Sequence, residues 1–423
     1  MTIAIIGAGL AGLSAAHALV ERGVGGIVVF DRREGPGLET SFANGALLHP
    51  SLVEPWNSPG VIGQLLRTFG QEDAAALLRL RALPSLVGWG LAFARESRPN
   101  LYLRNTLVNL ALARLSVDQM AGIRASGLAY DHQPRGSLVL FRDVDSQRAA
   151  LAWAERLAAH GLHHERMDVA AAVAREPALA AIAPELVGAI YHADDESGDA
   201  QRYCVELAAR LAAAGVGFRY GTRVHGLEAI AGCVAALRTD NDRLPVDTVI
   251  LAAASHSPQL ARTVGLSLPV RPAKGYSVTI PLAGDAFKPR TPVIDPALHV
   301  AVVPVGDDRL RVAGTAEFCG LDLTIRPKRV ANLVRQMARL YPAIVDATPA
   351  ERRSVWAGLR PMTPDGVPLI GATAVRGLYL NTGHGHLGWT LAAGSASVLA
   401  DVFLGRRPAL DPEPYALARF ATH

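Results

Sequence analysis

The sequence predicts an α/β protein with two sheets, one mainly parallel with strands alternating with helices, the other mainly antiparallel. Three observations lead to this prediction. A β-branched apolar run at residues 2–6 is followed by glycines and an alanine-rich helical pattern. Buried, strand-like runs recur at 27–30, 247–252 and 378–382. Between residues 271 and 312 the runs alternate polar with apolar residues around a Gly-Asp-Asp turn, as in antiparallel hairpins. The length of 423 residues leaves room for two domains.

The first strand, loop and helix carry the spacing G-x-G-x-x-G, and a second strand ends at Asp31. Gly7 permits a tight turn, Gly9 lets a pyrophosphate approach the backbone, and Gly12 lets the helix pack close to the strand. The unpaired N–H groups of the helix N-terminus favour phosphate, and an acidic side chain at the strand tip can bind a ribose diol. We therefore predict a Rossmann-like dinucleotide-binding domain. Its expected contacts are Gly7, Ala8, Gly9, Leu10, Ala11, Gly12, Asp31 and Arg32.

Charge and cysteine usage exclude several other classes. Residues 3–20 carry no Asp, Glu, Lys or Arg, but their glycines and polar side chains argue against a membrane span, and no basic stretch precedes them as in a signal peptide. The net charge of +4 contains no long run of like charges, so we expect no nucleic-acid partner. The three cysteines are far apart, which predicts no disulfide framework, no zinc site and a cytoplasmic location.

Two irregular stretches follow the dinucleotide motif. Residues 40–45 offer small hydroxyl and amide side chains, and we predict that Thr40, Ser41, Asn44 and Gly45 contact the cofactor. Residues 49–60 are too rich in proline for a helix or an inner strand, which is typical of an active-site wall. A surface loop remains an alternative for the first stretch.

The stretches Thr40–Gly45 and Glu54–Gly60 resemble the signature of bacterial FAD-dependent D-amino-acid dehydrogenases of the small-subunit type, which belong to the D-amino-acid oxidase superfamily. The resemblance covers nearly the whole chain. It implies FAD as cofactor and the oxidation of a D-amino acid by hydride transfer from Cα to flavin N5. Hydrolysis of the imino acid then yields a 2-oxo acid and ammonia, and electrons pass to a quinone or another acceptor.

The middle of the chain shows no catalytic motif. Its helical and strand patterns precede an acidic loop at 194–199, for which a solvated turn is favoured over a metal site. The resemblance implies that Val224 contacts the adenine and that Ala253 lies beside the cofactor, although Ser255-His256 replaces the usual glycine–aromatic pair. The expected elements are helices within 61–130 with a break at Pro84, a strand at 136–141, a helix at 145–160, a strand at 189–192, a helix at 201–214 and a strand at 216–220.

A second glycine-rich loop, at residues 383–390, joins a strand to a helix that runs to about Leu404. The resemblance implies that this helix N-terminus faces the flavin pyrimidine ring. His384 and His386 have a spacing that metals can use, but no carboxylate or cysteine lies near them in the sequence, and we predict no metal. No cysteine occurs at 355–359, so FAD is expected to be non-covalent. The expected contacts are Gly383, His384, Gly385, Leu387, Gly388 and Thr390.

Recognition of the substrate is predicted to rest on Arg360, which resembles the carboxylate-binding arginine of the family. A planar guanidinium offers two parallel donors that match a carboxylate. Tyr276, through its hydroxyl, His49 and His384 are further candidates. A buried structural ion pair is the alternative role for Arg360.

We predict an FAD-binding domain at 1–85, 145–263 and 341–423 and a substrate domain at 86–144 and 264–340. Alternatives within the superfamily are a dehydrogenase for cyclic imino acids such as hydroxy-D-proline and a glycine or sarcosine oxidase. From other classes, an electron-relay subunit of a heteromeric flavoprotein and an NAD(P)-dependent oxidoreductase are alternatives, but Arg360 and the loop at 383–390 argue against both, since neither is needed unless substrate and flavin meet there. The choice of oxidase or dehydrogenase, the oligomeric state and peripheral contact with the inner membrane also stay open.

Overall fold

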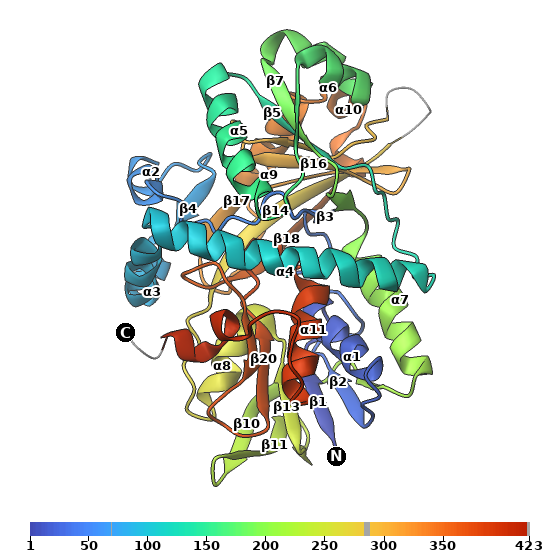
Figure 1. Ribbon diagram of the computed structural model, residues 1–423, viewed down its shortest axis with the longest axis vertical. Helices are drawn as coiled ribbons and strands as arrows, with labels where there is room; N and C mark the ends of the chain where they lie inside the picture. Colours follow the sequence, from blue (N-terminus) through green and yellow to red (C-terminus); the bar gives the residue numbers. More distant parts are fainter. Residues whose placement is uncertain (69, 283–287, 421–423) are drawn as a thin grey trace.

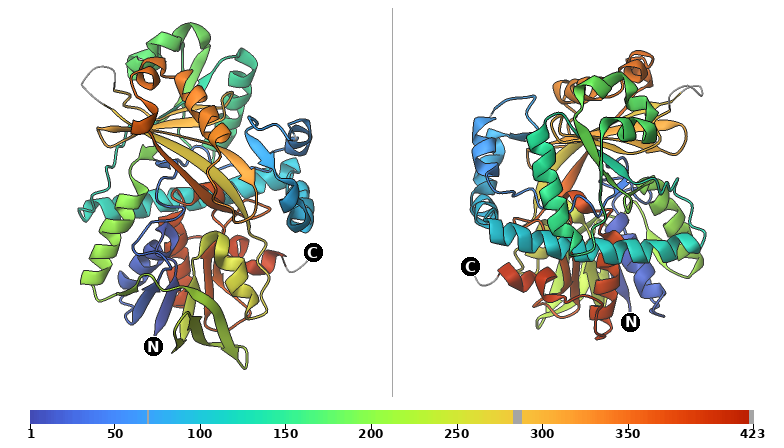
Figure 2. Two further views of the ribbon diagram at one scale, coloured as in Figure 1. Left: turned by 180° about the vertical axis from the view of Figure 1, so that it is seen from behind. Right: turned by 45° about the horizontal axis from the view of Figure 1, so that its top comes forward.

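The computed structural model describes residues 1–68, 70–282 and 288–420. Within them the chain forms two large sheets at opposite ends of an elongated molecule, and the long helix α4 (Pro99–Ala125) runs across the middle (Figure 1). The N-terminus lies at the end with the parallel strands (Figure 1), and Figure 2 shows the molecule from behind and tilted so that its top comes forward. This arrangement confirms the predicted α/β class with two sheets.

The first sheet has six strands in the described part of the chain, and its buried strands follow the predicted apolar runs. Alternate residues of the central strand serve two cores, because Ile3 and Ile5 pack toward helices while Ala4 and Ile6 pack toward a small antiparallel sheet. In spatial order its strands are β19 (Leu369–Ala372), β20 (Leu378–Thr382), β13 (Thr248–Leu251), β1 (Ile3–Ile6), β2 (Ile27–Phe30) and β9 (Gly217–Arg219).

Helices cover one face of this sheet and the small sheet covers the other. Strand β1 is parallel to both neighbours, and the chain adds β2 next on one side of it and β13 much later on the other side. Ligands of open α/β sheets bind beyond the carboxyl ends of the strands at such a switch point. The covering elements are α1 (Leu10–Val20), α7 (Ala200–Ala213), α11 (Ala392–Phe403), β10 (Val224–Ile230), β11 (Cys233–Thr239), β12 (Arg243–Pro245) and α8 (Ser257–Arg262).

The second sheet is mainly antiparallel, as predicted, and has nine strands among the described residues. Helix α9 (Pro327–Ala338) packs on it through Leu333 and Met337. The path runs β18 (Ser354–Met362), β14 (Arg271–Pro281), β17 (Arg309–Phe318), β16 (Val300–Val305), β15 (Val293–Asp295), β5 (Ser137–Phe141), β7 (Gly188–His192) and β6 (Glu165–Met167), and β4 (Ala76–Leu78) pairs with β17.

Strand pairing corrects the predicted boundaries at three places. Strands β6 and β7 lie in the predicted FAD segment 145–263 but belong to the second sheet, where β7 pairs with β5 and β6 pairs with β7. Strand β18, from the segment 341–423, pairs with β14 there too. Helix α4, predicted within the substrate segment, packs on α11, where a Cβ at Gly394 would lie 2.5 Å from Leu112 O. The sequence pattern could not assign these three strands to a sheet, because a buried strand has the same pattern of apolar residues in either sheet.

The acidic loop 194–199 is not the solvated turn that was expected. Asp195 is fully buried and accepts hydrogen bonds from Ser51 Oγ (2.5 Å) and Ser137 Oγ (2.6 Å). Asp199 caps α7 and pairs with Arg309 at 2.8 Å. Asp195 thus joins the segment at Ser51 to β5, and Asp199 joins α7 to β17, each through partners far away in the sequence.

The remaining helices line the outside of the two sheets. No helix in the described ranges is long and apolar enough to cross a membrane. Pro84 stands in the first turn of a helix rather than interrupting one, which suits its missing N–H. The elements are α2 (Val61–Arg67), α3 (Leu83–Glu96), α5 (Val144–Ala158), α6 (Val169–Arg175), α10 (Pro342–Asp346), and the short paired strands β3 (Leu47–Leu48) and β8 (Glu196–Ser197).

Candidate active site

The glycine loop after β1 has the tight geometry that its spacing predicts. Gly7 has φ +114°, and a Cβ there would lie 2.5 Å from Ala252 O. A Cβ at Gly12 would lie 1.9 Å from Gly7 O, so only glycine lets α1 pack this closely. A Cβ at Gly9 would lie 3.1 Å from Ser41 Oγ. The loop therefore leaves an open backbone surface at the N-terminus of α1.

A first cavity lies at the carboxyl ends of β1, β2 and β13 and holds about 960 Å³ of empty space. At its edge, Asp31 accepts hydrogen bonds from Ala8 N (2.7 Å) and Arg33 N (2.8 Å). Burial raises the pKa of Asp31, and these two backbone donors oppose that rise. Of the predicted cofactor contacts, the cavity brings together Gly7, Gly9, Asp31, Arg32, Thr40, Ser41, Val224 and Ala253.

A second cavity, with about 1260 Å³ of empty space, lies between the two sheets. The two cavities share lining residues, among them Gly9 and Thr40, so they lie next to each other. The predicted residues along the second cavity are Leu10, Ala11, Asn44, Gly45, His49, Tyr276, Arg360, His384, Gly385 and Gly388.

Five residues that were predicted to contact the cofactor line neither cavity but support the walls of the two cavities. Ala8 gives its N–H to Asp31, and Gly12 packs against the turn. Leu387 is buried in the core, and Thr390 Oγ1 accepts a hydrogen bond from His49 N (3.1 Å). Gly383 has φ +78° and little space for a side chain. The spacing of residues in a glycine-rich loop does not show which of them face the cavity, because that depends on the conformation of the loop backbone.

Arg360 is the single charged side chain along the described wall of the second cavity. It extends from β18, donates from Nη1 to Thr315 O (2.9 Å), and its guanidinium lies 5.3 Å from the Trp56 ring centroid. Gly275 opposite leaves it room, since a Cβ there would lie 2.1 Å from Nη1. Among the described residues no carboxylate lies within 4.0 Å of it. The alternative of a structural ion pair therefore finds no support.

Burial lowers the pKa of Arg360 to about 10, so the guanidinium is still protonated at neutral pH. Burial also lowers the pKa of His384 to about 4 and that of His386 well below its ordinary value. Both imidazoles are therefore neutral at pH 7. The cavity thus presents one positive charge with no negative partner, which favours an anionic ligand group.

The three histidines at the cavity have different partners. His384 Nε2 lies 3.0 Å from Ser395 Oγ, and His386 stacks on Trp56 with ring centroids 5.2 Å apart. His49 Nδ1 is buried without a hydrogen-bond partner among the described residues. His386 and Trp56 are cavity residues to which the sequence analysis assigned no ligand contact. The described residues contain no group of three or more metal-ligating side chains.

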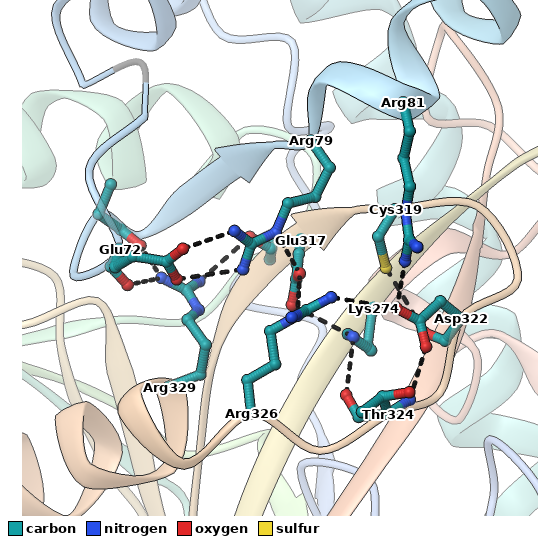
Figure 3. Close-up of polar contacts among 12 residues, drawn as sticks. Glu72, Arg79, Arg81, Lys274, Glu317, Cys319, Asp322, Thr324, Arg326 and Arg329 are labelled. Carbon is teal, nitrogen blue, oxygen red and sulfur yellow. Dashed lines mark hydrogen bonds and ion pairs between the residues drawn. The ribbon is translucent and has the colours of Figure 1, made fainter.

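The predicted role of the Tyr276 hydroxyl needs correction. Although Tyr276 lines the cavity, its hydroxyl donates to Glu317 Oε2 at 2.6 Å. A phenol has a single proton, so this hydroxyl cannot donate to a substrate carboxylate at the same time. Glu317 also contacts Lys274 (3.3 Å) and Arg79 (2.6 Å) in a buried cluster (Figure 3). Side chains alternate between the two faces of β14, so Lys274 and Tyr276, two residues apart, both turn toward this cluster.

Comparison with known families agrees with this geometry. Residues 2–402 match the DAO family, described as "FAD dependent oxidoreductase". The chain belongs to the DAO family. FAD is the cofactor of this family, and the paired cavities and the glycine cradle suit a dinucleotide. The expected family and cofactor are therefore confirmed.

Curated relatives of this DAO family chain match over its full length. A D-amino acid dehydrogenase of Paramagnetospirillum magneticum is 43% identical over 425 residues, which is 100% of both chains. Another, of Dechloromonas aromatica, is 40% identical over 98% of this chain and 99% of that one. The fold resembles L-proline dehydrogenase from P. horikoshii, with TM-score 0.78 and 17% identity over 100% of this chain and 98% of that chain. It also resembles glycine oxidase from Geobacillus kaustophilus, with TM-score 0.74 and 24% identity over 99% and 98%.

Replacement of Asp31 by Ala is expected to weaken FAD binding about ten- to a hundred-fold. The change removes an acceptor for the ribose and also the partner of Ala8 N, at a cost of roughly 1.5–3 kcal/mol. Titration of the apoprotein with FAD measures the dissociation constant, while kcat at saturating FAD should change little. Asp145→Ala, at an exposed helix position, is the control. Unchanged FAD affinity of the Asp31 variant would place Asp31 outside the site.

Proposed function

We propose that this chain oxidises D-amino acids to 2-oxo acids and ammonia with FAD, and passes the electrons to an acceptor other than oxygen. One observation supports it most directly, namely that the charged Arg360 faces the cavity without a counter-ion. Every amino acid carries a carboxylate, and a guanidinium binds it through two parallel hydrogen bonds. The names of the full-length relatives support the D-configuration and the dehydrogenase activity.

The residues of the second cavity would bind and orient the substrate. Arg360 would take the carboxylate, with Trp56 beneath the guanidinium and Gly275 leaving space in front of it. Bound there, FAD would supply the acceptor for the hydride that leaves Cα. The neutral imidazoles of His49, His384 and His386 can accept a hydrogen bond from the amine without competing for the carboxylate. Holding the substrate in one orientation is the main contribution that the protein can make to such a reaction.

FAD would lie along both cavities. Asp31 and Val224 would contact its adenosine, the glycine loop its pyrophosphate, and the loop at 383–390 its ring system. A helix N-terminus near the ring would stabilise negative charge on it by roughly 0.3–2 kcal/mol. None of the three cysteines lines either cavity, which supports non-covalent attachment.

Acid precipitation of the purified holoprotein is therefore expected to release all of its flavin into the supernatant. No described cysteine faces a cavity to form a covalent link. Absorbance and chromatography of the supernatant identify the flavin as FAD and quantify it per chain. Yellow precipitate, or FMN in place of FAD, would contradict the assignment.

The proposal is tested by anaerobic reduction of the bound flavin. D-amino acids should bleach the flavin, whereas their L-enantiomers should not, and the panel includes glycine, sarcosine and hydroxy-D-proline as the alternative substrates. Reoxidation is then timed with air and with a quinone. Bleaching by glycine or by cyclic imino acids alone would support one of the alternatives, and rapid formation of hydrogen peroxide in air would make the protein an oxidase.

A further inference from the structure

A third cavity lies beside the second one and takes no part in the site described above. It holds about 1410 Å³ of empty space, part of it open to solvent. Its described wall comes from α2, α4, β16, β17, α9 and the segment at 54–58. Trp56 lines both the second and the third cavity, so the two lie next to each other. A part of the substrate that reaches past Trp56 would therefore enter the third cavity.

The backbone of β17 is irregular where these two cavities adjoin. Between Gly314 and Glu317 this strand advances three residues while β14 advances two, which is a β-bulge. Thr315, inside the bulge, has φ +58°, a strained conformation for a β-branched residue. Its carbonyl accepts the hydrogen bond from Arg360 Nη1, and the residue also lines the third cavity. The bulge thus links the arginine proposed to bind carboxylate directly to the wall of the third cavity.

Hydrogen bonds on α9 determine which atom of Gln336 is left for a ligand. Asn332 Nδ2 donates to Asp73 O (3.2 Å), so Asn332 Oδ1 is an acceptor. Gln336 Nε2 donates to that oxygen at 3.4 Å. Gln336 Oε1 is then buried without a hydrogen-bond partner among the described residues, as is Thr315 Oγ1. Because an amide oxygen can only accept, the third cavity contains an acceptor that lacks a donor.

The charged side chains along the third cavity are acidic. Glu54 and Asp73 line it, and no Lys or Arg does so among the described residues. Glu54 Oε1 accepts a hydrogen bond from Trp153 Nε1 (2.6 Å), which fixes the position of the carboxyl group. His299, also in the wall, is neutral at pH 7, because burial lowers its pKa. Two carboxyl groups and an unpaired acceptor favour a ligand group that is positively charged and rich in N–H donors.

We propose that the third cavity binds the cationic end of a substrate side chain, an ammonium or a guanidinium group, while Arg360 holds the substrate carboxylate. Such an amino acid carries its side-chain charge several bonds beyond Cα, which suits a site next to the second cavity. Arg360 and the third cavity offer opposite charges, so a substrate bound with its ends exchanged would meet like charges. The inference deepens the proposed function and rests on it only for oxidation at Cα, because binding of the charged end needs no turnover.

The binding test uses two ligands that lack an α-amine. 6-Aminohexanoate has the carbon skeleton of lysine with a charge at each end, and hexanoate lacks the terminal ammonium. Calorimetric titration of the holoprotein should show 6-aminohexanoate binding about tenfold or more tightly than hexanoate, because charged hydrogen bonds form at its ammonium end. Equal affinities would overturn the proposal, whether or not the protein oxidises D-amino acids.

Two variants assign the effect to the third cavity. Gln336→Leu removes the unpaired acceptor, and Glu54→Gln removes a charge while keeping the shape of the side chain. Each should bring the affinities of the two ligands close together. Glu155→Gln makes the same chemical change at an exposed position of α5 outside the described wall, and should keep the wild-type preference. FAD content and circular dichroism verify that each variant is folded. A loss of preference in either cavity variant supports the assignment, and wild-type preference in both would overturn it.

Turnover with a dye acceptor extends the test to substrates. D-Norleucine has the side chain of D-lysine without the terminal ammonium, so the ratio of their kcat/KM values isolates the charged group. Gln336→Leu and Glu54→Gln should each shift this ratio against D-lysine by about tenfold. An unshifted ratio in both variants would overturn the proposal. Failure of every D-amino acid to bleach the flavin would instead contradict the proposed function and leave the binding result standing.

Discussion

Replacement of Arg360 by Leu is expected to lower kcat/KM for D-amino acids about thirty- to several-thousand-fold. The change leaves the substrate carboxylate without its partner inside the cavity, at a cost of roughly 2–5 kcal/mol. At about 1.4 kcal/mol per factor of ten, that cost corresponds to the stated range. Steady-state rates with a dye acceptor, measured across substrate concentrations, give kcat/KM. FAD content should remain near that of the wild type, because Arg360 is assigned to the substrate.

Two further variants sharpen this test. Arg360→Lys keeps the charge but loses the planar pair of donors, so it should recover little activity. Arg376→Leu removes a positive charge from an exposed loop that lines neither cavity and should behave like the wild type. If Arg360→Leu keeps the wild-type kcat/KM, or loses its flavin, Arg360 does not bind the substrate carboxylate.

Replacement of Glu317 by Gln is expected to destabilise the fold by about 3–5 kcal/mol. Glu317 and Lys274 are both fully buried, and their charged groups lie 3.3 Å apart. Removing one partner of a buried pair leaves the other charge uncompensated, which costs about this much. Urea unfolding of the FAD-saturated protein measures the loss as a shift of the midpoint at constant slope.

The effect should depend on pH in a defined direction. Burial by itself would raise the pKa of Glu317, but hydrogen bonds from Tyr276 and Arg79 and the charge of Lys274 outweigh it and lower the pKa from 4.5 to about 2. The folded-state pKa lies below the unfolded value, so the stabilisation is fully present above pH 4.5. It is lost as the pH falls toward 2. The stability gap between the wild type and Glu317→Gln should therefore narrow over that range.

Removing both charges is the decisive control. Lys274→Met combined with Glu317→Gln leaves less uncompensated charge and should be more stable than Glu317→Gln alone. Asp145→Asn, which breaks an exposed ion pair with Arg148, should change the unfolding free energy by less than about 1 kcal/mol. A Glu317 variant as stable as the wild type would show that the buried cluster contributes nothing to stability.

The sequence by itself determined the dinucleotide unit, because every element there acts locally. The glycine spacing, the following helix and Asp31 at the strand tip lie within about thirty residues, and each has a physical role that neighbours in the chain define. The resemblance of the later motifs to the family predicted FAD as the cofactor and Arg360 as the residue that binds the substrate carboxylate. The structure places Arg360 at the cavity without a counter-ion, as a ligand-binding role requires.

Only the tertiary structure decided what depends on partners far apart in sequence. The hydroxyl of Tyr276 points to Glu317, forty-one residues away, because β14 pairs with β17 in a register that no single strand encodes. Strands β6 and β7 belong to the second sheet because β7 pairs with β5 and β6 pairs with β7. Local pattern sets the type of an element, and long-range pairing sets which of its side chains meet.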